Sequence, residues 1–144
     1  MKLPGTLAKE FLAARFTANQ AALVAAGATG IYGERAPETA VEPFVTVQMV
    51  YAVDVSPPTR GGTPTAKLGY QIVAWDQGDR DDRIDAIADA IDTALRGAAP
   101  VAVTGGAVLD CSPRGEVPAP LSIEGGQTYK RAGQTWELLV EVTS

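Results

Sequence analysis

A strand that leads directly into an amphipathic helix constrains the fold of this chain more than any other feature. The segment 66–75 alternates between apolar and polar residues, as does a strand with one buried face. The segment 81–96 has the period of a helix, and its apolar residues fill an arc of roughly 120°, the width of a stripe that packs on a core. The apolar faces carry Leu68, Tyr70, Ile72 and Ala74 on the strand, and Ile84, Ile87, Ala88, Ile91, Ala94 and Leu95 on the helix. The chain therefore needs a sheet with a helix packed against it.

The N-terminal part of the chain adds more helix. Residues 6–26 are predicted to be helical, in two pieces, because their apolar residues recur at helical spacing. Thr6 is the expected N-cap, since its hydroxyl can accept a hydrogen bond from the free N–H groups of the first turn. Gly27 is expected just past the end, where glycine adopts a positive φ without a Cβ clash.

Further segments alternate like strands. Residues 44–53 are predicted to bury one face, which carries Val45, Val47, Met49, Tyr51 and Val53. Residues 129–142 alternate in their second half, and residues 101–111 form either one strand or two short strands around a Gly-Gly pair. The order helix, strands, helix, strands predicts an α+β fold. We expect a single domain, residues 1–144, with a mostly antiparallel β-sheet and helices packed on one face.

Two segments rich in proline and glycine, residues 54–65 and 112–127, are predicted to be long loops. Both exceed the usual length of a hairpin loop, about 2–5 residues, and long loops on a rigid sheet often carry function. Four of their side chains are unusual choices for a loop that contacts only water, so we expect them to contact a partner protein, with loops that are merely tolerated as the alternative. These side chains are Arg60, Arg114, Leu121 and Ile123.

Composition removes several classes of function. The chain has no histidine and a single cysteine, Cys111, so it lacks a Ser/His or Cys/His nucleophile, a usual zinc site and an internal disulfide. Cys111 is expected to be a buried apolar residue. The net charge of −5 disfavours a surface that binds duplex DNA. No run approaches the ~18 apolar residues of a membrane helix and no signal peptide is recognised, so we expect no membrane partner.

The aspartates of residues 76–92 raise the main question about chemistry. No register that begins at Asp76 or Asp79 fits a calcium loop, because the required central glycine falls at the wrong place. The aspartates that precede the helix instead suit its N-terminus, where carboxylates meet free N–H groups. Asp85, Asp89 and Asp92 recur on one helical face. We interpret that face as solvated, with a partner surface, a pore lining and a metal site as alternatives, and we expect no metal and no cofactor.

Glu137 and Glu141 share one face of the last strand, which leaves a carboxylate-dependent hydrolase as the enzymatic alternative. A glycosidase needs two carboxylates with different pKa values, and the sequence suggests no apolar pocket that would separate the pKa values of Glu137 and Glu141. We therefore expect that the chain is not an enzyme. A simple adaptor domain is a further alternative.

Four segments of the chain are informative because of the order in which they occur and the spacing between them. They are GIYGERAPETAVEPFVTVQM, LGYQIVAWDQ, DRDDRIDAIADAIDTALRG and YKRAGQTWELLVEV. Together they resemble the bacteriophage tail-terminator or tail-completion proteins, minor tail proteins at the head–tail joint, over most of the chain. The positions that match that family are Ile31, Tyr32, Ala36, Pro37, Pro43, Phe44, Val45, Trp75, Ile84, Leu95, Gly97, Arg131 and Trp136. The proline-rich segment 54–64 departs from the family pattern.

The resemblance implies a structural, non-enzymatic component of the virion. Such subunits look like α+β proteins that form a hexameric ring on the head-proximal end of the tail tube, assembled in the host cytoplasm. The ring stops tube polymerisation and offers a docking surface to the head-completion or connector protein, while genomic DNA passes through its lumen. The implied partners are therefore further copies of the chain, the tail-tube protein and the head-completion protein.

Two points remain open under this resemblance. Asp85, Asp89 and Asp92 are candidates for the lumen, where carboxylates would repel the phosphates of passing DNA. A head-completion or connector ring on the capsid side is the alternative within viral assembly.

Overall fold

The computed structural model describes residues 3–33, 40–56, 65–77, 82–116, 122–124 and 127–143. The elements, in chain order, are α1 (Pro4–Ala18), α2 (Gln20–Ala26), β1 (Ile31–Gly33), β2 (Phe44–Ser56), β3 (Thr65–Gln77), α3 (Asp82–Leu95), β4 (Val101–Val103), β5 (Gly106–Glu116), β6 (Ser122–Glu124) and β7 (Gln127–Val142). This mixture of helices and strands confirms the predicted α+β fold. None of the helices in the described ranges is both long and apolar enough to cross a membrane.

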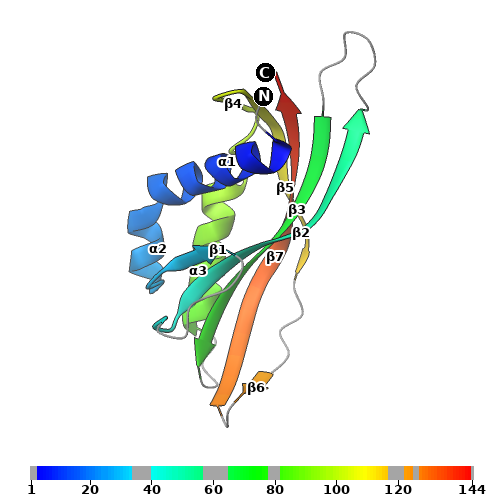
Figure 1. Ribbon diagram of the computed structural model, residues 1–144. Helices are drawn as coiled ribbons and strands as arrows, with labels where there is room; N and C mark the ends of the chain where they lie inside the picture. Colours follow the sequence, from blue (N-terminus) through cyan, green and yellow to red (C-terminus); the bar gives the residue numbers. More distant parts are fainter. Residues whose placement is uncertain are drawn as a thin grey trace.

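The strands form one sheet in the order β1-β2-β3-β7-β5-β4, and β6 pairs with β7 outside that path. β1 runs parallel to β2, and the other pairs are antiparallel, as predicted. The long strands β2, β3 and β7 make a twisted central ribbon (Figure 1). Across the β3–β7 pair Tyr70 lies opposite Trp136, and Leu68 lies opposite Leu138. These side chains therefore share one face.

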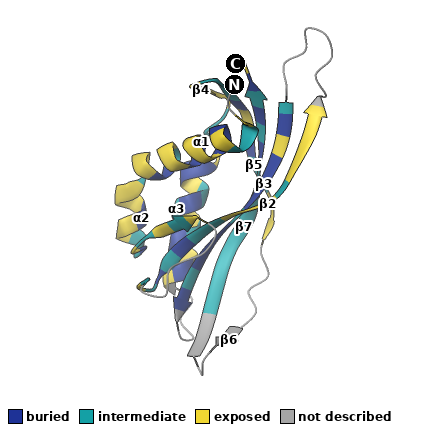
Figure 2. Cartoon of the chain, viewed as in Figure 1, coloured by how far each residue is buried: buried dark blue, intermediate teal, exposed yellow. Residues whose placement is uncertain are grey.

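α1 and α3 lie against that face, α2 packs on these two helices, and no described helix covers the opposite face, which we call the open face (Figure 1). The core fills the space between the helices and the sheet, and Figure 2 shows the buried residues gathered there. The largest fully buried side chains come from both layers: Phe11 and Leu7 from α1, Ile87 and Leu95 from α3, and Trp136, Tyr70, Leu68, Ile72, Leu138, Val45, Val108 and Val140 from the sheet. One core therefore holds the two layers together.

α3 confirms the amphipathic stripe predicted for residues 81–96. Its apolar residues Ile84, Ile87, Ile91, Ala94 and Leu95 are at most 3% exposed. Asp85 and Asp89 lie on the exposed side of the same helix. Gly97 follows the helix with a φ of 74°, the left-handed conformation that glycine adopts at a helix end without a Cβ clash.

The joint between β3 and α3 carries an ion pair between a buried aspartate and a partly exposed arginine, which sequence reasoning did not find. β3 continues to Gln77 rather than ending at Trp75, and this places Asp76 inside the protein, 1% exposed. The Nε and Nη2 atoms of Arg83 each donate a hydrogen bond of 3.0 Å to the Asp76 carboxylate. The expected capping aspartates Asp79 and Asp81 lie outside the described residues.

The N-terminal segment forms two helices, as predicted, but Thr6 is not the N-cap. α1 begins at Pro4, and the N-cap position is held by Leu3, which makes no capping hydrogen bond through its side chain. Proline suits the first helical position because its φ is already helical and its missing N–H would have no partner there. Gly27 ends α2 with a φ of 112°, which confirms its predicted role.

The face predicted for residues 44–53 is wrong in its second half. The pairing of β2 with β3 shifts at Val50, which is an extra residue and makes a β-bulge. Since side chains alternate across a strand, one extra residue turns Tyr51 and Val53 to the open face. Val45, which precedes the bulge, is fully buried against the helices, as predicted.

Both predicted loops are shorter than expected. β5 continues through residues 112–116, and β6 and β7 occupy most of the stretch from Ser122 onward. Pro113 pairs with β7 on one side, and β4 pairs with β5 only at its first three residues, so among the described strands Pro113 lies on an edge, where proline is tolerated. In the other predicted loop, β2 continues to Ser56 and β3 already begins at Thr65. Residues 57–64 lie outside the described part.

Candidate interaction surfaces

The open face carries a hydrogen-bonded cluster of polar side chains at its centre. The Tyr51 hydroxyl donates to Glu137 Oε1 at 2.8 Å, and Arg114 Nε donates to Glu137 Oε2 at 3.0 Å. The Glu137 side chain is 14% exposed, and the Arg114 side chain is 53% exposed. Burial alone would raise the pKa of Glu137, but the hydrogen bonds from Tyr51 and Arg114 outweigh it and hold the pKa below the ordinary value. The cluster therefore carries an ionised carboxylate.

The Tyr51 ring is seated on a glycine. Tyr51 lies opposite Gly69 in the β2–β3 ladder, and a Cβ at Gly69 would collide with the ring. An aromatic ring that covers a glycine of the neighbouring strand is a known device for stabilising such a site. The β-bulge at Val50 is what turns Tyr51 to this face, so the bulge positions the cluster.

A second group of side chains on the open face consists largely of residues that match the family pattern described above. Trp75 lies opposite Arg131 in the β3–β7 ladder, and the Arg131 guanidinium lies 5.5 Å from the centre of the indole. The indole Nε1 donates a hydrogen bond of 2.9 Å to the hydroxyl of Thr46. Nearby on β2, the ring of Phe44 makes an edge contact with Tyr32 of β1 at 6.1 Å between centroids. Matching positions that lie far apart in the sequence are thus neighbours on one face of the sheet.

The acidic face of α3 borders a polar hollow. Asp85, Asp89 and Asp92 line it together with Glu116 of β5 and with Ala88, Ala132, Gly133 and Gln134, and its volume is 660 Å³. The hydrogen bonds from Arg96 hold the pKa of Asp92 below the ordinary value. Within the described residues no group of three or more Cys, Asp or Glu side chains is arranged to hold a metal ion. The predicted solvated face is exposed at Asp85 and Asp89 and half-buried at Asp92.

The predicted partner-contact residues are not brought together by the described structure. Arg60 and Leu121 lie outside the described residues, and Ile123 is placed on β6 by its backbone alone. Arg114 belongs to β5 rather than to a loop, and it forms an ion pair of 2.7 Å with Glu137. Glu137 is thus engaged by Tyr51 and Arg114, and its lowered pKa is the opposite of what a general acid of a hydrolase requires.

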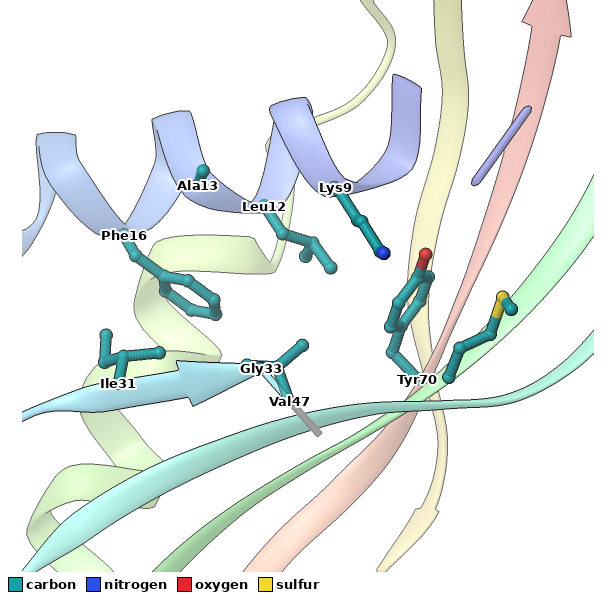
Figure 3. A pocket seen from close by; sticks show the side chains of 9 residues that line it. Lys9, Leu12, Ala13, Phe16, Ile31, Gly33, Val47 and Tyr70 are labelled. Atoms are coloured by element: carbon teal, nitrogen blue, oxygen red, sulfur yellow. The ribbon is translucent and has the colours of Figure 1, made fainter. Parts of the chain in front are cut away.

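Sequence reasoning missed an apolar pocket between α1 and the β1–β2 side of the sheet. The pocket has a volume of 420 Å³ and is lined by Lys9, Leu12, Ala13, Phe16, Ile31, Gly33, Val47, Met49 and Tyr70 (Figure 3). Its rim exposes Met49 and Ile31, which are 46% and 37% accessible. Helical periodicity predicts the buried side of α1, but it cannot show that the sheet leaves a gap beside that helix.

Both edges of the sheet are incompletely paired within the described ranges. β1 pairs with β2 only at Val45, Thr46 and Val47, so the edge of β2 from Gln48 onward has no described neighbour. The exposed apolar residues of this edge are Met49, Val50, Val53 and Val55. β4 likewise pairs only with the first three residues of β5. Unpaired edges of this length are sites at which a second chain can add a strand.

Comparison with known proteins agrees with this architecture. A chain from the solved structure "Virion of native gene transfer agent (GTA) particle" has the same fold, with a TM-score of 0.75 at 18% sequence identity, over 98% of this chain and 99% of that chain. No curated protein matches the sequence. The family model for "Tail completion protein gp17" matches residues 10–117, which is more than half of the chain. The chain therefore belongs to the tail completion protein gp17 family and is a structural protein of a phage-like tail.

Proposed function

We propose that this protein forms a hexameric ring that caps the head-proximal end of the tail tube. In this role it stops tube polymerisation and presents the docking surface for the head-completion or connector protein. The family supports a role in tail completion, and the single observation that carries the ring is the pair of unlike sheet edges.

The geometry of the edges suits a closed ring. A ring interface is heterologous, so each subunit needs two different surfaces that meet by rotation. The parts of β2 and β5 that have no second neighbour among the described strands lie at opposite edges of the sheet and differ in sequence. Pairing or docking between them would remove both edges from solvent, which is how proteins avoid open-ended aggregation.

We place the acidic face of α3 toward the lumen. Asp85 and Asp89 are exposed beside a polar hollow, and negative charge there would keep the duplex from adhering as it slides past. For the outer contacts we retain Arg60, Arg114, Leu121 and Ile123 as residues that meet the tube or the head protein. A reconstruction of the ring with Asp85 and Asp89 on its outer rim would contradict the lumen assignment.

Mass measurement and partner binding test this function. Size-exclusion chromatography with light scattering is expected to give six subunit masses, or a concentration-dependent rise toward that value. Purified portal particles serve as the comparison partner, because a capsid-side connector would bind them in preference to tail tubes. A protein that remains a monomer both at high concentration and in the presence of tubes would contradict the ring.

A further inference from the structure

The pocket beside α1 contains a buried hydroxyl without a partner. The Tyr70 side chain is 2% exposed, and its hydroxyl has no hydrogen-bond partner among the described residues. Burial raises the pKa of Tyr70, so the phenol keeps its proton and acts as a donor. A buried donor without an acceptor is unfavourable, and native proteins seldom leave one unmatched.

A cation lies beside that hydroxyl. Lys9 extends from α1 toward the Tyr70 hydroxyl at the side of the pocket (Figure 3). In the described part of the chain Lys9 makes no ion pair. The rest of the lining is apolar, with Leu12, Phe16 and Val47 as its walls. The pocket therefore matches an occupant that has a bulky apolar group next to a carboxylate.

The opposite edge of the same subunit carries such a pair of groups. Leu109 is an extra residue at the bulge in β5, just beyond the end of the β4 pairing, and it is 37% exposed. Asp110, the next residue, is exposed, and its carboxylate accepts one hydrogen bond, from Ser112. The pocket lies at the β1–β2 side of the sheet, and the bulge lies at the β5–β4 side. A heterologous contact needs two different surfaces of this kind on each subunit.

We propose that the Leu109–Asp110 bulge of a second copy of this chain inserts into the pocket. Leu109 fills the apolar part, and Asp110 accepts a hydrogen bond from Tyr70 and pairs with Lys9. The inference rests on the proposed ring, and it names the residues that close each interface.

One position in the lining of the pocket allows a larger side chain to be introduced. A Cβ at Gly33 would meet no atom within 4 Å, and Gly33 lines the pocket. Gly33→Phe is therefore expected to occupy the pocket, and Gly33→Ala is the matched control. On the other surface Leu109→Glu removes the apolar group, and Val101→Glu on β4 is its matched control, because Val101 is 39% exposed. The thermal unfolding of each monomer verifies that it is folded.

The decisive experiment mixes the two impaired variants and measures mass by light scattering. Gly33→Phe and Leu109→Glu are each expected to remain monomers, while both controls form rings. An equimolar mixture of the two is expected to give dimers, since the intact pocket of one variant can accept the intact bulge of the other. Neither partner of that dimer retains a second working surface, so assembly stops there.

Tyr70→Phe adds a test of the polar part. It removes only the hydroxyl, so we expect the concentration for half-assembly to rise about tenfold, the effect of losing one hydrogen bond to a charged group. Because that hydroxyl has no partner within the described subunit, the monomer should not become less stable. Rings of wild-type mass from both Gly33→Phe and Leu109→Glu would overturn the proposed contact between pocket and bulge, but not the proposed ring. A wild-type chain that forms no ring at all would overturn the proposed function and this interface together.

Discussion

Arg83 binds the buried carboxylate of Asp76 through two hydrogen bonds of 3.0 Å, and this contact joins the end of β3 to the first turn of α3. Asp76 is the last described residue of β3 that is fully buried, and Arg83 lies in the first turn of α3. An ionised carboxylate inside a protein is stable only with partners of this kind. The contact therefore ties the start of α3 to the end of β3 in addition to the apolar packing of the helix.

The first prediction concerns this ion pair. Arg83→Ala should lower the free energy of unfolding by about 1.5–3 kcal/mol, because hydrogen bonds to a charged group are lost while the carboxylate stays buried. Arg83→Lys should recover only part of the loss, since an ammonium group cannot bind the carboxylate with two parallel hydrogen bonds. Urea denaturation measures both.

Arg96→Ala is the control for the loss of an arginine as such. Arg96 pairs with Asp92 on the surface of α3, where its side chain is 57% exposed, and exposed pairs contribute little. Equal losses of unfolding free energy for Arg83→Ala and Arg96→Ala would show that the burial of Asp76 adds nothing to the contribution of its ion pair.

The second prediction concerns pH and the cluster on the open face. The pKa of Glu137 is lower in the folded chain than its ordinary value of 4.5, so the folded state binds fewer protons there than the unfolded state. This contribution to stability is present above pH 4.5 and is lost as the pH falls through the folded pKa. Glu137→Gln should flatten the acid side of the stability profile, and Arg114→Ala should flatten it in part. An unchanged slope in Glu137→Gln would refute the assignment.

The third prediction concerns the contact between Tyr51 and Gly69. Gly69→Ala should destabilise the protein by about 1–3 kcal/mol, because the added Cβ displaces the ring that covers the glycine. The same change in a Tyr51→Ala background should cost clearly less. The difference between the two costs is the coupling energy. Additive losses would mean that the two residues do not act on each other.

The fourth prediction concerns Cys111, which sequence reasoning correctly expected to be buried. Burial raises the pKa of the thiol to about 12, so the reactive thiolate is nearly absent at neutral pH. Iodoacetamide should therefore label Cys111 only after denaturant is added. Rapid labelling of the native protein would contradict the buried position.

Sequence patterns were reliable where a single period decides the structure. The stripe of α3 and the buried face of β3 follow from side-chain geometry alone, so Ile87 and Tyr70 lie where the pattern predicts. The alternating pattern of β2 failed beyond Val50, because a β-bulge there exchanges the buried and the open face of the strand, and the sequence does not reveal the bulge. It also misassigned Pro113, which suggests a loop unless the strand is known to lie at an edge.

The candidate surfaces depend on contacts between distant segments, which no local period reveals. The pocket joins α1 to β1, β2 and β3, and the cluster on the open face joins Tyr51 to Glu137 across β3. Family resemblance identified the class of protein, because it compares whole successions of segments. It did not identify the side chains at which one subunit would meet the next.

Electron microscopy of tail-tube subunits polymerised with and without this protein tests the central claim most directly. The account predicts that tubes grown with the protein present end at one side in a ring and stop growing there. Tubes that grow to the same lengths as in its absence, with bare ends on both sides, would contradict a role as the cap of the tube.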